Sequence, residues 1–202
     1  MVTQKRKPGS EFPIAGIDVV EHELTVDMVQ VGAKGRKEKL IETLLFKGRM
    51  TLERRNPEKI ARGKDAGKRK IEFFVRTWVA SAFSKELQTE ILYLLSEDVK
   101  QKPSMIIAEA PARDFPAEFI FNVTFDARAN NKTIRRRHHG RPHGTGFRTV
   151  PPDGNRRNSP TITGFEDNFI QLKHPTYGTI RFVPRHCNDN QGETIVSLST
   201  SN

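Results

Sequence analysis

Hydrophobic and polar residues alternate with a period of two over most of this chain, a pattern typical of strands with one buried face. The clearest case is 71–79, where Ile71, Phe73 and Val75 share one side of the expected strand. The other alternating segments are 24–28, 44–52, 119–125, 169–172, 179–183 and 194–198. Gly48 interrupts one of them, and there we expect a β-bulge or a bend. The pattern predicts at least seven short strands.

One segment, 84–99, fits two structures. Ser84 is a suitable N-cap, and Leu87, Ile91, Leu94 and Leu95 follow at helical spacing. The same segment also alternates, at Leu87, Thr89 and Ile91, as a pair of strands would. The sequence therefore allows one helix here or a strand pair.

Many strands and at most one helix predict an all-β, mainly antiparallel fold, either a β-sandwich or a β-barrel. We expect one β-rich domain over 14–202, preceded by a flexible basic arm at 1–13. Within that arm, Gly9-Ser10-Glu11-Phe12 is also typical of a cloning scar. Two segments rich in charge, Gly, Pro and Asn, 53–70 and 128–160, are expected to be long loops.

Positive charge is concentrated in two parts of the chain, whose formal net charge is +10. Residues 32–70 contain fourteen Lys and Arg against five acids, and 132–157 contain eight against one. Such segregation creates a local field that attracts anions. Arginine in particular offers a rigid fork of donors that matches phosphate or carboxylate oxygens.

The second basic segment is the candidate site. The predicted anion- or nucleic-acid-binding residues are Lys132, Arg135, Arg136, Arg137, Arg141, His143, Arg148, Arg156 and Arg157. Only Phe147 interrupts the charge, so contacts to a phosphate backbone are favoured over stacking on bases. A solvated, flexible loop without a ligand is the alternative interpretation.

Other chemistry finds less support in the sequence. His138, His139 and His143 are weak candidates for metal ligands, because the first two would point apart on a strand and nearby arginines repel a dication. No metal site and no cofactor is therefore predicted. No catalytic motif is present, although Cys187 follows His186, so the sequence favours a protein without enzymatic activity but leaves the question open. His22 is interpreted as an ordinary strand residue and Trp78 as part of the core.

Three functions remain for comparison. The favoured one is a β-sandwich module that binds nucleic acid or another polyanion through its Arg/His-rich loop. The second is a capsid-like or other self-assembling protein, a homo-oligomer with basic loops. The third is a small-molecule enzyme with an apolar pocket in the β domain and Arg and His at its mouth. A single cysteine and the lack of a 20-residue apolar run predict a cytoplasmic protein in a reducing compartment.

Overall fold

The computed structural model describes residues 11–32, 37–130, 132–141, 143–147, 162–163, 170–184 and 198–200, with backbone alone at 162–163 and 198–200. All regular structure in these residues is β-strand, paired antiparallel throughout. The strands are β1 (Gly16–Gln30), β2 (Lys39–Arg54), β3 (Glu58–Lys59), β4 (Arg69–Ser84), β5 (Thr89–Leu95), β6 (Ser104–Ala110), β7 (Arg113–Ile120), β8 (Val123–Ala129), β9 (Lys132–Gly140), β10 (His143–Phe147), β11 (Ile162–Thr163), β12 (Ile170–His174), β13 (Gly178–Pro184) and β14 (Leu198–Thr200).

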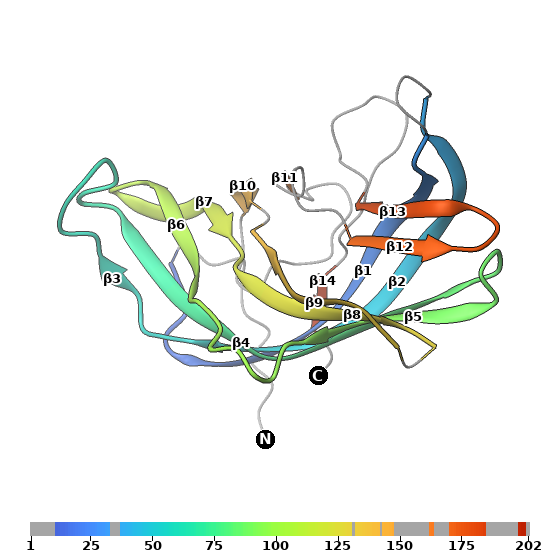
Figure 1. Ribbon diagram of the computed structural model, residues 1–202. Helices are drawn as coiled ribbons and strands as arrows, with labels where there is room; N and C mark the ends of the chain where they lie inside the picture. The colour runs from blue at the N-terminus through green and yellow to red at the C-terminus, as the bar shows by residue number, and fades with distance from the viewer. Residues whose placement is uncertain are drawn as a thin grey trace.

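Three long strands, β1, β2 and β4, form the floor of the molecule (Figure 1). The first part of β4 pairs with β6, which continues through β7 and β10 to β11. The last part of β4 pairs instead with β5, which continues through β8 to β9. On the other side, β1 pairs with β13, and β13 with β12. Since β9 lies next to β12 without a ladder among the described strands, the sheet is a nearly closed barrel.

A β-bulge in β4 lets this strand serve both halves of the sheet. Leu52 of β2 pairs with Val75, but its neighbour Thr51 pairs with Thr77, so Arg76 is the extra residue. Before the bulge the odd-numbered residues of β4 are buried, and after it the even-numbered ones are. An extra residue bends a strand and increases its twist. The bulge therefore turns the strand while keeping its apolar side chains on the inner face.

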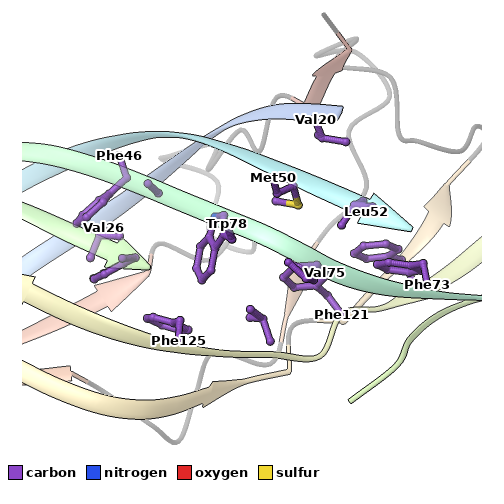
Figure 2. Packing of buried hydrophobic residues seen from close by; sticks show 14 of the residues in the cluster. Val20, Val26, Phe46, Met50, Leu52, Phe73, Val75, Trp78, Phe121 and Phe125 are labelled. Atoms are coloured by element: carbon purple, nitrogen blue, oxygen red, sulfur yellow. The ribbon is translucent and has the colours of Figure 1, made fainter. Parts of the chain in front are cut away.

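Aromatic residues fill the inner face in two groups (Figure 2). In one group Phe73 stacks on Phe119 with ring centroids 5.4 Å apart, and Phe119 lies 5.1 Å from Phe147. The other group includes Phe46, Trp78 and Phe125, toward the opposite end of the floor. Alternation along each strand brings both groups inside, because every second side chain points the same way.

The predicted all-β antiparallel class is confirmed, and 84–99 is a strand pair. Ser84 ends β4 and Thr89 begins β5, with a turn between them. The Ser84 hydroxyl does cap a local turn, since its Oγ accepts the Leu87 N–H at 3.1 Å, but Gln88 then takes a positive φ of 50° and the chain reverses. The helical alternative for this segment is wrong.

The structure agrees with the loop expected at 53–70 but not with the loop expected at 128–160. In 53–70 the chain leaves β2 at Arg54 and returns in β4 at Arg69, with only the two-residue β3 between them. The prediction of a loop at 128–160 is wrong for its described part, because strands β9 and β10 occupy it. A bulge at Gly48 is wrong as well, since β2 pairs without interruption there on both sides.

The segment before β1 packs against the sheet from residue 12 onward. Phe12 is buried and meets the ring of Phe115 edge-on, with centroids 5.1 Å apart. Its backbone N–H donates to the carboxylate of Asp114. Residues 1–10 of the expected arm lie outside the described part of the chain. Across the described residues, no helix has the length and apolarity that crossing a membrane requires.

Candidate ligand-binding site

Five aromatic side chains form a continuous cluster on the inner face, here called the central cluster: His22, Trp78, Tyr93, Phe125 and His138. Trp78 meets Phe125 nearly edge-on, with centroids 4.9 Å apart at 80°. Tyr93 lies 5.2 Å from Phe125, and His138 lies 5.0 Å from it on another side. These residues come from β1, β4, β5, β8 and β9. The cluster thus joins the floor of the sheet to one of its walls.

His22 reaches Trp78 only because the residue between them is glycine. His22 pairs with Gly48 across β1 and β2, and Gly48 pairs with Ala80 across β2 and β4. A Cβ on Gly48 would stand 2.4 Å from Cε1 of His22, a distance that real Cβ contacts do not show. The imidazole therefore lies over the glycine, and its Nε2 accepts a hydrogen bond of 2.9 Å from Nε1–H of Trp78.

This hydrogen bond determines the protonation of His22. Indole nitrogen only donates, so Nε2 of His22 must present a lone pair, and the neutral ring carries its proton on Nδ1. Burial lowers the pKa of His22 from 6.5 to about 4, which keeps the ring neutral at pH 7. The Nδ1–H is buried and has no hydrogen-bond partner in the part of the chain that the structure describes.

A second neutral histidine lies at the other end of the cluster. Burial, the positive charge of Arg135 and the neighbouring His139 lower the pKa of His138 from 6.5 to about 4. Between the two histidines, burial raises the pKa of Tyr93. At neutral pH the central cluster is therefore uncharged, and its polar groups are an imidazole at each end, the indole N–H of Trp78 and one phenol.

The rings of the central cluster are almost completely buried, to about the same extent as Phe119 and Phe121 of the other aromatic group. Trp78, Phe125 and His138 keep 9%, 8% and 8% of their surface exposed, and His22 keeps 6%. Phe46, which stacks on Tyr93 with centroids 4.4 Å apart, is 0% exposed. A flat apolar molecule is the kind of ligand that such a set of rings accommodates, by stacking and edge-to-face contact.

The predicted anion-binding residues lie elsewhere, mostly on the outer side of β9. Lys132, Arg135, Arg136 and Arg137 of β9 are exposed, as is Arg141 after it. Arg148, Arg156 and Arg157 lie outside the described residues. The structure therefore brings part of the predicted set onto one strand, with its side chains exposed rather than among the buried rings of the central cluster.

Two of the basic residues already have acidic partners. The guanidinium of Arg137 pairs with the carboxylate of Asp98. Nε2 of His143 lies 2.7 Å from Oε1 of Glu118 on the neighbouring strand β7. Acidic side chains, one in the turn after β5 and one on β7, thus already pair with basic residues that the sequence assigned to a polyanion.

The three candidate metal ligands are separated. His138 is buried against Phe125, His139 points the other way with Nδ1 3.3 Å from Oγ1 of Thr124, and His143 belongs to β10. Burial, Lys102 and Arg141 lower the pKa of His139. Among the described residues no three His, Cys, Asp or Glu side chains form a group that could hold a metal ion. His186 and Cys187 lie outside those residues.

Sequence reasoning missed His22 and took Trp78 for core alone. A usable signal was present, because His22 stands between Val20 and Leu24 at a position where the alternation calls for an apolar side chain. A polar side chain at a buried position is normally hydrogen-bonded to another group. The partner, Trp78, is 56 residues away, so the sequence alone could not supply it.

The chain matches no protein-family model and no curated protein sequence. Among solved structures it resembles DynF from the dynemicin biosynthesis pathway of Micromonospora chersina, with 16% sequence identity and a TM-score of 0.50. The likeness covers 93% of this chain and 78% of DynF. At 16% identity this likeness shows only that the fold is similar.

This finding overturns the interpretation of the chain as a nucleic-acid or polyanion-binding module. The fold is found in a protein of a biosynthesis pathway, and the described part of the supposed binding loop forms strands β9 and β10 of the barrel wall. The sequence was misleading because charged residues on the exposed face of a strand resemble a charged loop. Self-assembly, on which the capsid-like alternative depends, stays a prediction.

Proposed function

We propose that this protein binds a small, flat, mainly apolar organic molecule on the inner face of its barrel, against the central cluster. The observation that carries the proposal is the buried and unpaired Nδ1–H of His22 among aromatic rings. Unsatisfied buried donors are rare in native proteins, and each calls for an explanation such as a bound molecule, an ion or a water. The likeness to DynF supports it, since a biosynthesis pathway handles small molecules.

The surroundings of the cluster favour an uncharged ligand or ligand part. Trp78, Tyr93 and Phe125 supply ring faces and edges, and both histidines are neutral at pH 7 because burial lowers their pKa values to about 4. A charged group placed among them would lose hydration without an opposite charge to replace it. The exposed arginines of β9 point to the outer side of the wall.

Trp78 is the single tryptophan of the chain, so its fluorescence reports directly on the proposed site. We expect coumarin, a flat bicyclic lactone, to quench this fluorescence in a saturable manner. The variant Phe125→Leu should weaken binding about fivefold, because it removes an aromatic contact worth on the order of 1 kcal/mol.

The matched control is Phe119→Leu, the same substitution at a similarly buried ring of the other aromatic group. It should leave the dissociation constant within about twofold of the unmodified protein. Equal weakening in both variants, or no saturable quenching in the unmodified protein, would contradict the proposed function.

A cytoplasmic location and self-association, both expected from the sequence, remain predictions that the proposal does not need. Analytical ultracentrifugation over a range of protein concentrations measures the second directly.

A further inference from the structure

The free nitrogen of the His22 ring narrows the class of ligand that the proposed site would bind. Trp78 Nε1–H occupies Nε2 of His22 at 2.9 Å, and this leaves Nδ1–H as the free polar atom of the ring. We propose that His22 selects ligands carrying a hydrogen-bond acceptor, such as a carbonyl oxygen or a phenolic oxygen, and receives that oxygen at Nδ1–H. The inference rests on the proposed function and adds the chemistry of recognition.

The direction of the hydrogen bond follows from the tautomer. If the imidazole were reversed, with its proton on Nε2, two N–H groups would face each other across the 2.9 Å gap. Protonating both nitrogens has the same effect, and burial also opposes it. The indole therefore holds the ring as a donor at Nδ1. A ligand amine that can only donate would face another donor and is disfavoured.

The position of the ring is fixed as well as its tautomer. His22 is 6% exposed and lies over Gly48, where a Cβ would also meet the Val79 carbonyl oxygen and the Ala80 Cβ. A ring held this firmly cannot turn its Nδ1–H toward solvent without losing the bond to Trp78. A preorganised donor gives affinity with little loss of conformational freedom on binding.

The charged groups of the neighbouring positions do not offer the missing acceptor. Glu21 and Glu23 flank His22 on β1 but alternate to the outer face, where Glu23 lies 3.7 Å from Lys47. The inner positions next to His22 on its own strand are Val20 and Leu24. Within the described chain no group accepts from Nδ1–H, and a ligand oxygen takes that role in the proposed site.

Two substitutions of His22 separate its two nitrogens. In His22→Gln the side-chain oxygen reaches the place of Nε2 and can still accept from Trp78, but the donor at the Nδ1 position is gone. In His22→Asn the amide N–H lies near the Nδ1 position, while the acceptor for Trp78 is gone.

The two probe ligands are coumarin, which has a carbonyl, and naphthalene, a bicyclic hydrocarbon without a hydrogen-bond acceptor.

We expect His22→Gln to weaken coumarin binding about tenfold, the typical effect of one hydrogen bond, and to leave naphthalene binding within about twofold. His22→Asn should retain more of the coumarin affinity than His22→Gln. If both probes weaken equally in His22→Gln, or neither weakens, the inference is overturned while the proposed function stands. If neither probe binds the unmodified protein, the proposed function fails.

A measurement on the unmodified protein covers the case in which the variants do not fold. Nitrogen-15 spectra of the histidine rings should show one ring with its proton on Nδ1, coupled to the indole of Trp78. Coumarin should move that Nδ1–H proton downfield, and naphthalene should not. An unchanged Nδ1–H resonance at saturating coumarin would overturn the inference, because the ring proton would then not contact the bound carbonyl.

Discussion

At the scale of single residues, Gly48, His22 and Trp78 depend on one another. Gly48 leaves the space in which the imidazole lies, and the imidazole then accepts from the only tryptophan. The result is a neutral ring with one fixed proton in an apolar environment. Such a ring is costly to charge, and this cost can be measured without any ligand.

Stability should therefore fall as the pH is lowered from about 6.5 to about 4. In the unfolded chain His22 and His138 titrate near 6.5, but in the folded protein only near 4. Between these values the unfolded state binds protons that the folded state does not, which favours unfolding. For His22 the full effect is about 3 kcal/mol, is absent above pH 6.5 and is complete below pH 4.

Urea unfolding followed by Trp78 fluorescence at pH 7 and pH 4.5 gives the free energies needed. Because carboxylates also titrate in acid, the comparison is with His22→Gln, which lacks this titrating group. The variant should lose less stability between the two pH values. Equal losses in both proteins would contradict the buried neutral state of His22.

At the scale of the elements, a bulge in β9 positions His138. Ala127 pairs with Arg135 and Phe125 with His138, so Arg136 and Arg137 together stand opposite one residue, Asp126. Arg137 adopts a positive φ of 51°, which is unfavourable for a residue with a side chain. The extra residue changes the face to which the following residues point, and His138 is thereby directed inward onto Phe125.

Asp126 stabilises this bulge and is the residue to change. Its Oδ1 accepts the backbone N–H of Arg137 at 2.8 Å and the hydroxyl of Ser96 at 2.6 Å. Asp126→Ala should lower the free energy of unfolding by about 1–3 kcal/mol, because it leaves two donors without their acceptor. It should also weaken coumarin binding, since His138 would lose its position in the cluster.

The control is Asp98→Ala, which removes the other carboxylate that contacts Arg137. That pair is exposed on both sides, so its loss should leave the urea midpoint almost unchanged. A larger effect from Asp98→Ala than from Asp126→Ala would show that the ion pair, rather than the carboxylate in the bulge, stabilises β9.

The same elements show how far the sequence could be interpreted. The alternation at Ile71, Phe73 and Val75 correctly predicted a strand, but the bulge at Arg76 depends on pairing with β2 and left no local signal. The pattern at 84–99 was ambiguous because Leu87, Thr89 and Ile91 suit both periods. Strand β9 was missed because its inward residues are few and its exposed face is crowded with arginines. The site was missed because it joins residues from five strands.

At the scale of the whole molecule, two walls of the sheet rise from the floor of β1, β2 and β4, and both pair with β4 (Figure 1). One wall packs its aromatic residues around Phe119, and the other contributes Tyr93, Phe125 and His138 to the central cluster. The proposed site therefore lies on the shared floor, next to the wall that β9 completes. Rigid strands rather than loops supply its side chains, a favourable arrangement for a preorganised site.

The most direct measurement of ligand binding at the central cluster is a nitrogen-15 correlation spectrum recorded during a coumarin titration. A single tryptophan gives one indole N–H signal, that of Trp78. Binding at the cluster predicts a saturable shift of this signal, together with the backbone amides of Tyr93 and Phe125. A Trp78 signal that stays in place, while shifts are confined to exposed positions such as Arg135 and Arg136, would contradict the account.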